Sequence, residues 1–180
     1  MPQPPFSAVS LEEILNAREA RAAHQRALLA RYPGATLVSL TVNMPGPVKR
    51  TPESDRVFAA GRIALAEALA RASLPVLHAE ARLPGTGCEA FFAVLAAPDA
   101  VKQLTCSLEE VLPFGRLLDC DVLAPDGALL SRTELGRPAR GCLVCGKEGA
   151  FCASRRAHPL DEILGAFARL AALAPEESPL

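Results

Sequence analysis

The chain has 180 residues, half of them apolar, and a formal net charge of −1 at pH 7. This near-neutral charge excludes a broadly basic nucleic-acid-binding protein, and the low content of aromatic residues leaves no platform for base stacking. The N-terminus lacks a signal-peptide layout, and no apolar run is long enough to span a bilayer, so we expect a cytoplasmic protein. In that reducing compartment, six cysteines favour free thiols or a metal site over disulfides.

The first predicted element is a helix over residues 11–31, which begins with a Ser-x-x-Glu capping box. Its inward stripe is unusual because Arg18, Arg21 and Gln25 continue it at helical spacing between apolar residues. One interpretation is that the apolar stems of these side chains pack while their heads reach water. The other is that two guanidinium groups point inward at an anion.

A strand over residues 37–43 and a helix over residues 52–72 follow, joined by a proline-rich loop. The loop carries Lys49 and Arg50 next to the helix N-terminus. Free N–H groups and the helix dipole favour an anion at that position. The loop is not a Walker motif, however, and basic residues are also common in solvated turns.

The next elements complete a recognisable order. They are strands over residues 75–83 and 88–97, a helix over 99–112 and a strand over 116–124. The resulting β-α-β-β-α-β order over residues 37–124 is that of a ferredoxin-like fold. We therefore predict an α+β protein with an antiparallel sheet, both of these helices on one face, and the other face left for a different role.

The remaining segments flank this core. We expect residues 1–180 to form a single domain, in which residues 125–180 are a C-terminal extension. This extension holds a cysteine- and histidine-containing segment, followed by a helix over residues 160–173 with one apolar stripe.

Asp119 and Asp121 interrupt the otherwise apolar strand over residues 116–124. Side chains alternate along a strand, so both carboxylates share one face while their apolar neighbours take the other. Two like charges side by side repel unless a cation or arginines neutralise them. A Mg²⁺ ion that bridges the carboxylates and phosphate oxygens would do so. A solvated sheet face or arginine-paired carboxylates would explain the same pattern.

Cys142, Cys145, Cys152 and His158 have the spacing C-x₂-C-x₆-C-x₅-H, which suits a tetrahedral Cys₃His zinc site. Reduced structural thiols are an alternative, as is a redox CxxC, although the latter normally begins a helix after a strand. Basic residues crowd around this segment and create a local positive field, suited to phosphates or an acidic partner. They are Arg132, Arg137, Arg140, Lys147, Arg155 and Arg156.

Three stretches carry a specific combination of motifs: LLARYPGATLVSLTVNMPGPVK, GRLLDCDVLAPDGALLSR and RGCLVCGKEGAFCASRRAH. Together they resemble the citrate lyase holo-acyl-carrier-protein synthase family, the CitX type, over nearly the whole chain. The resemblance implies a nucleotidyltransferase-type enzyme. Its donor would be 2′-(5″-triphosphoribosyl)-3′-dephospho-CoA, whose phosphoribosyl-dephospho-CoA part goes to a serine of the apo acyl carrier (γ) subunit of citrate lyase, with release of diphosphate.

This chemistry gives the candidate residues expected roles. Asp119 and Asp121 would hold Mg²⁺ against the α-phosphate and help to activate the serine hydroxyl. Arg116 would be a further catalytic residue that binds the triphosphate. The cysteines and His158 would hold a structural zinc ion. The expected substrate-binding residues are Arg18, Arg21, Gln25, Pro45, Gly46, Pro47, Lys49, Arg56, Ser131 and Arg132.

Two other functions remain open at this stage. One is the equivalent transfer to the carrier subunit of malonate decarboxylase, which bears a related prosthetic group. The other is a non-catalytic, zinc-bearing adaptor that binds an acyl carrier through its basic residues. Neither nucleic acid nor a membrane is an expected partner.

Overall fold

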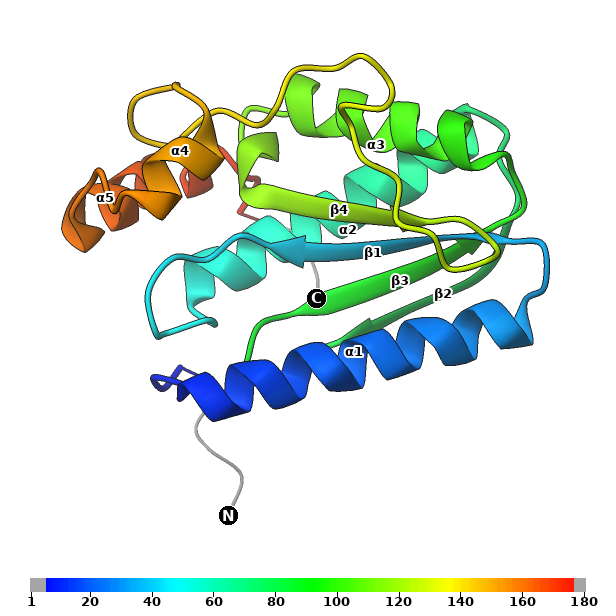
Figure 1. The fold of residues 1–180 in the computed structure, drawn as a ribbon, viewed down its shortest axis with the longest axis horizontal. Helices are drawn as coiled ribbons and strands as arrows, with labels where there is room; N and C mark the ends of the chain where they lie inside the picture. Colours follow the sequence, from blue (N-terminus) through cyan, green and yellow to red (C-terminus); the bar gives the residue numbers. More distant parts are fainter. Residues whose placement is uncertain (1–5, 177–180) are drawn as a thin grey trace.

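The computed structural model of the protein describes residues 6–176 (Figure 1). None of the described helices is long and apolar enough to cross a membrane. The elements are α1 (Leu11–Arg31), β1 (Thr36–Val42), α2 (Pro52–Arg71), β2 (Val76–Arg82), β3 (Glu89–Val94), α3 (Pro98–Val111), the 3₁₀ turn η1 (Gly115–Leu117), β4 (Leu118–Leu123), α4 (Gly149–Ser154) and α5 (Leu160–Ala171).

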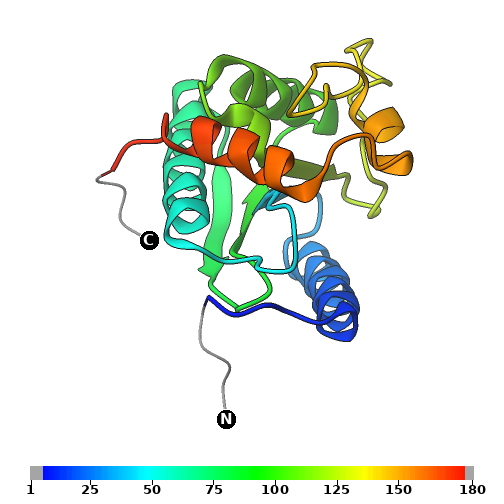
Figure 2. The same ribbon diagram turned by 90° about the vertical axis from the view of Figure 1, so that its left-hand side faces the viewer.

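The four strands form one sheet in the order β2-β3-β1-β4, and each strand is antiparallel to its neighbours. This is the ferredoxin-like arrangement that the element order predicts, so the α+β fold class is confirmed. Figure 2 shows α2 and α3 on one side of the sheet and α1 on the other. The second face is therefore partly covered by α1 rather than left open.

Alternation along the strands sorts the side chains between these two faces. Leu118, Cys120 and Val122 of β4 join the main core beneath α2, α3 and α5, as the pattern predicts. Asp119 and Asp121 consequently point to the face that α1 crosses. A smaller apolar cluster on that face joins the C-terminal end of α1 to β1 and β3 and fixes the helix on the sheet.

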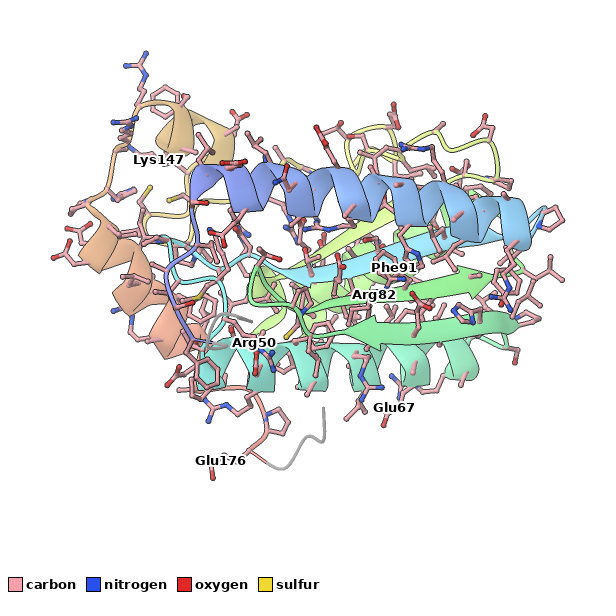
Figure 3. The ribbon with its side chains drawn as sticks, turned by 90° about the horizontal axis from the view of Figure 1, so that it is seen from below. Arg50, Glu67, Arg82, Phe91, Lys147 and Glu176 are labelled. Atoms are coloured by element: carbon pink, nitrogen blue, oxygen red, sulfur yellow. The ribbon has the colours of Figure 1, made fainter. Side chains whose placement is uncertain are left out.

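The polar stripe of α1 meets a polar part of the sheet. Arg21 Nε donates to Glu89 Oε2 at 2.9 Å, and the imidazole of His24 contacts Glu80. Arg82 lies 5.8 Å over the ring of Phe91, which shares this face (Figure 3). Of the stripe that looks anomalous in the sequence, Arg21 is thus paired at the helix–sheet contact.

Two local predictions differ from the structure. The strand expected over residues 116–124 begins at Leu118, because residues 115–117 form η1. A Cβ atom at Gly115 would lie 2.5 Å from the carbonyl oxygen of Glu109, so only glycine lets the chain turn so close to α3. The short helix α4, which carries Cys152, has no clear sequence signal and was not predicted.

The loop that carries Lys49 is held by an ion pair with little exposure. Arg50 and Asp55 form hydrogen bonds of 2.9 Å, with 13% and 10% of their side chains exposed. The Cys88 thiol donates to Asp55 Oδ1 at 3.2 Å, and Arg50 Nη1 donates to the carbonyl oxygen of Leu83 at 2.7 Å. This pair ties the start of α2 to the hairpin between β2 and β3.

Asp55→Ala is expected to lower the free energy of unfolding by about 3–5 kcal/mol, because it leaves Arg50 buried without its carboxylate. Urea denaturation measures this loss. Glu67→Ala is the matched control, since Glu67 projects from α2 into solvent and pairs with Arg71 at 3.2 Å (Figure 3). The control should change stability by no more than about 1 kcal/mol. Equal denaturation midpoints for Asp55→Ala and wild type would contradict the structural role of the pair.

Candidate active site and candidate metal centre

A cavity of about 170 Å³ lies between the N-terminal half of α1 and the sheet. We call it the polar cleft, and its charged lining residues are Arg18, Arg21, Lys49 and Asp119. Lys49 Nζ donates to the carbonyl oxygen of Met44 at 2.8 Å. Burial and the nearby Arg18 lower the Lys49 pKa from its ordinary value. Arg21 also pairs with Glu89, but Arg18 and Lys49 together with it outweigh the single lining carboxylate, which makes the cleft a suitable site for a polyanion.

The two aspartates of β4 have different surroundings. Asp119 has 48% of its side chain exposed and accepts a hydrogen bond of 2.9 Å from Arg140 Nη1, while Arg140 also pairs with Glu109 at 2.8 Å. Burial and the charge of Asp119 raise the pKa of Asp121, whose carboxylate has no hydrogen bond among the described residues. The arginine-paired interpretation thus applies to Asp119, whereas Asp121 has no direct partner in the described part of the chain, and only the nearby charges of Lys102, Arg21 and Arg140 oppose the rise in its pKa.

Arg116 lies in η1 beside this pair. Its Nε donates to the carbonyl oxygen of Gly141 at 2.8 Å, and Nη2 contacts the same oxygen. Its Nη1 is buried and has no hydrogen-bond partner among the described residues. Burial and the neighbouring Arg140 lower the Arg116 pKa. One donor of this guanidinium is therefore available to a ligand.

Ser131 and Arg132 reach the aspartates from the C-terminal segment. Both line a cavity of about 240 Å³ that Asp119 and Asp121 also line. Arg132 Nη2 donates to Glu110 at 2.6 Å, which holds this segment against α3. The structure therefore brings residues from both ends of the chain to the outer edge of β4.

Other residues with expected substrate contacts lie elsewhere. Arg56 Nη2 donates to the carbonyl oxygen of Ala171 at 3.0 Å and so anchors α5 on α2. Gln25 and the loop over residues 45–47 do not line the polar cleft, and a Cβ at Gly46 would lie 3.5 Å from Leu160 of α5. These positions suit packing, and they give no support to substrate contacts by Arg56, Gln25 or the 45–47 loop.

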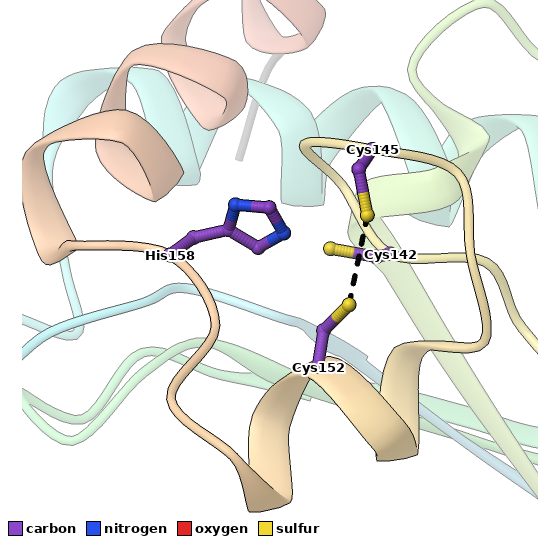
Figure 4. A group of neighbouring side chains, drawn as sticks. All are labelled: Cys142, Cys145, Cys152 and His158. Atoms are coloured by element: carbon purple, nitrogen blue, oxygen red, sulfur yellow. Dashed lines mark hydrogen bonds between the residues drawn. The ribbon is translucent and has the colours of Figure 1, made fainter.

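Cys142, Cys145, Cys152 and His158 converge at the other side of the C-terminal segment (Figure 4). One ligand atom from each lies within 4.8 Å of all the others. The first two cysteines lie on a loop that turns at Gly146, where φ is +72°. Cys152 comes from α4, and His158 precedes α5. The spacing predicted this set, and the fold brings all four side chains together.

The chemistry of these four groups fits a metal ion. His158 Nε2 is buried without a hydrogen-bond partner among the described residues, while Nδ1 lies 3.4 Å from Glu162 Oε2. A carboxylate on the far nitrogen is the usual support for a metal-binding imidazole. The backbone N–H of Lys147 lowers the pKa of Cys145 to about 7, whereas burial raises that of Cys152 to about 11. The cluster could bind a metal such as zinc.

Arg140 and Glu109 are candidate functional residues that no motif in the sequence identifies. Arg140 holds Asp119 and Glu109, yet in the sequence it is one of many basic residues around the cysteines. Glu109 Oε1 also accepts from the backbone N–H of Cys120 at 2.9 Å. A helix pattern places Glu109 on α3 but does not show that it reaches β4, so only the fold identifies this group.

Comparison with known proteins agrees with the resemblance noted in the sequence. Residues 9–172 match the family model described as CitX, apo-citrate lyase phosphoribosyl-dephospho-CoA transferase. A protein of that name from Citrobacter koseri is 40% identical over 157 residues, which cover 87% of this chain and 85% of the relative. Proteins of the same name from Escherichia coli O6:K15:H31 and Shigella boydii serotype 18 are each 38% identical over the same shares.

Proposed function

The chain belongs to the apo-citrate lyase phosphoribosyl-dephospho-CoA transferase family, and from this premise we propose how its own residues carry out the transfer. The relatives' names favour a citrate lyase carrier over that of malonate decarboxylase, and a transferase over a non-catalytic adaptor. We propose that the acceptor is a serine of the apo acyl carrier subunit. The donor is 2′-(5″-triphosphoribosyl)-3′-dephospho-CoA.

The observation that carries this proposal is the polar cleft, which joins an excess of cations to Asp119 of β4. In the reaction, the serine oxygen forms a bond to the α-phosphorus, the bond from that phosphorus to the β-phosphate oxygen breaks, and the hydroxyl proton leaves. Arg18, Arg21 and Lys49 bind the departing diphosphate and stabilise its growing charge. The carboxylate pair accepts the proton of the serine.

Asp119 and Asp121 would also hold Mg²⁺. The fit rests on Asp121, whose carboxylate has no hydrogen-bond partner among the described residues and lies beside a second carboxylate on the same face. The ion would supply positive charge at the α-phosphate, in the way divalent cations serve phosphoryl transfer in general. Arg140 positions Asp119 through its hydrogen bond, and Arg116 directs its free donor toward the donor phosphates.

We further propose that Cys142, Cys145, Cys152 and His158 hold a structural zinc ion. Their loop follows Arg140 directly, so a closed metal centre would fix this arginine at the aspartates. Because residues from both ends of the chain meet at β4, we treat residues 1–180 as one functional unit. All six cysteines are free of disulfides, which suits work in the cytoplasm.

Lys49→Met is expected to lower kcat/KM for the donor by about 10–100-fold, since a hydrogen bond to a charged group contributes about 1.5–3 kcal/mol. Wild type should also lose donor kcat/KM as the pH rises toward the lowered Lys49 pKa, because the ammonium then loses its proton. Initial rates across an alkaline pH series measure both effects. Arg26→Met removes an exposed cation of α1 and should leave the profile unchanged. An unaltered alkaline limb in Lys49→Met would exclude this role.

A comparison of carriers tests the proposed function. Diphosphate release should require this protein, the donor and the apo carrier of citrate lyase together. The malonate decarboxylase carrier should react much more slowly. Rapid release with the malonate decarboxylase carrier alone would reassign the acceptor, and release with neither carrier, despite a verified donor, would overturn the transferase assignment.

A further inference from the structure

A second, larger cavity lies where α4 and the start of α5 meet η1 and the loop after β1. It has a volume of about 860 Å³, within the usual range for pockets that bind cofactor-sized molecules. We call it the large cavity. Much of its wall consists of small or apolar side chains, namely Ala139, Leu143, Val144, Ala150, Ala153 and Ile163, and one side is formed by Cys142, Cys152 and His158 of the Cys₃His cluster. Such a wall favours the apolar part of a ligand.

Four arginines line the large cavity, namely Arg116, Arg132, Arg140 and Arg156, and Glu148 is the one carboxylate in the lining. Arg132 and Arg140 are paired with carboxylates outside the cavity, whereas Arg116 and Arg156 form no ion pair among the described residues. Among the described residues, Arg116 Nη1 and Arg132 Nε are buried without a hydrogen-bond partner. Buried donors without a partner are costly, and ligand phosphates would satisfy them.

Arg156 is an exposed cation at the C-terminal end of α4. Its φ is +48°, a left-handed backbone conformation that a non-glycine residue adopts at a cost. This conformation is the usual left-handed cap of a helix C-terminus: the Arg156 N–H donates to the carbonyl oxygen of Ala153 at 3.2 Å, and the Ala157 N–H to that of Cys152 at 3.0 Å. The cap turns the chain along the large cavity, which Arg156 lines.

The large cavity adjoins the candidate active site through shared lining residues. Asn43 at the end of β1 lines both the polar cleft and the large cavity. Arg132 and Arg140 line the large cavity and also the cavity that contains Asp119 and Asp121. A ligand whose body fills the large cavity can therefore place one end at the aspartates.

We propose that the large cavity binds the dephospho-CoA body of the donor, an inference that rests on the proposed function. The pantetheine arm and adenine suit the apolar wall, and the diphosphate that joins them suits the arginines. The triphosphate is carried by a separate ribose on the adenosine, so it can extend past Asn43 into the polar cleft. A folded carrier protein would cover a surface rather than fill this space, so we assign the cavity to the donor.

Dephospho-CoA itself is a suitable probe, because it lacks the triphosphoribosyl group and cannot react. Calorimetric titration of the full-length protein should detect its binding. Ala153→Phe places a ring in the large cavity and should weaken binding at least tenfold, and it should raise the donor KM while leaving the carrier KM unchanged. Ala168→Phe is the matched control on an exposed face of α5, away from the cavity lining, and should bind as wild type does.

Arg156→Ala provides a second test that does not depend on the folding of Ala153→Phe. The Arg156 side chain is exposed, so its removal takes away no core packing. It should weaken dephospho-CoA binding several-fold and reduce the salt dependence of binding. The proposal would be overturned if dephospho-CoA did not bind to wild type, or if Ala153→Phe and Arg156→Ala both bound it with wild-type affinity. It would also be overturned if Ala153→Phe raised only the KM for the carrier. Binding as expected without any transfer to the carrier would instead retain the cavity assignment and reject the proposed function.

Discussion

Asp121→Asn is expected to lower the rate of carrier modification by about a thousandfold without loss of the fold. The amide cannot replace a charged ligand for Mg²⁺ or accept the serine proton, and a metal ion contributes several kcal/mol to the stabilisation of such a transition state. Asp119→Asn should have a similar effect, because it also breaks the hydrogen bond that Arg140 donates. Single-turnover rates at saturating donor measure both losses.

Stability distinguishes this result from simple misfolding. Burial and Asp119 raise the folded-state pKa of Asp121, so its ionised form destabilises the fold at neutral pH. Asp121→Asn removes that penalty and should keep or raise Tm, with about 2–4 °C for each kcal/mol gained. Asp99→Asn, an exposed carboxylate in the first turn of α3, should retain full activity. A fully active Asp121→Asn variant would remove the aspartate pair from the mechanism.

If the Cys₃His cluster holds zinc as proposed, Cys145→Ser is expected to abolish zinc binding and disorder the segment from Arg140 to His158, with at least a hundredfold loss of transfer. Structural zinc contributes about 10–16 kcal/mol in apparent binding free energy, which the short helix α4 and its loops cannot replace. The ferredoxin-like sheet should remain folded, because its main core is built largely from the strands, α2 and α3.

Metal analysis and limited proteolysis measure these effects together. Wild type should contain about one zinc ion per chain. Cys145→Ser should contain almost none and should be cleaved between Arg140 and His158. Cys106→Ala is the matched control, since this buried thiol of α3 lies outside the Cys₃His cluster. Well-folded, active wild-type protein without zinc would show that the cluster consists of reduced structural thiols.

The local patterns of the sequence predict much of this molecule. Period-two alternation separates Asp119 and Asp121 from the apolar residues of β4, and the order of the elements leads to the correct sheet topology. Cysteine spacing predicts the Cys₃His set, because the members lie within 17 residues of one another in the chain. These features depend on residues that are close in the sequence or on a common supersecondary motif. A single amino-acid sequence is therefore enough to predict them.

Contacts between distant segments could not be predicted in the same way. Arg116 was expected on a strand, but the close approach of Gly115 to α3 places it in a 3₁₀ turn. The basic residues around the cysteines suggest a free positive field, yet Arg132 and Arg137 both pair with Glu110. The large cavity is formed by segments that no periodicity connects. Such features arise from tertiary packing, which overrides local preference.

Intact-mass spectrometry of an apo citrate lyase carrier subunit tests the central claim most directly. The carrier is incubated with this protein, the triphosphoribosyl-dephospho-CoA donor and Mg²⁺. We predict that the carrier gains the mass of one phosphoribosyl-dephospho-CoA group on a serine, and that EDTA prevents the gain. An unchanged carrier mass, with folded protein and a verified donor, would contradict the account.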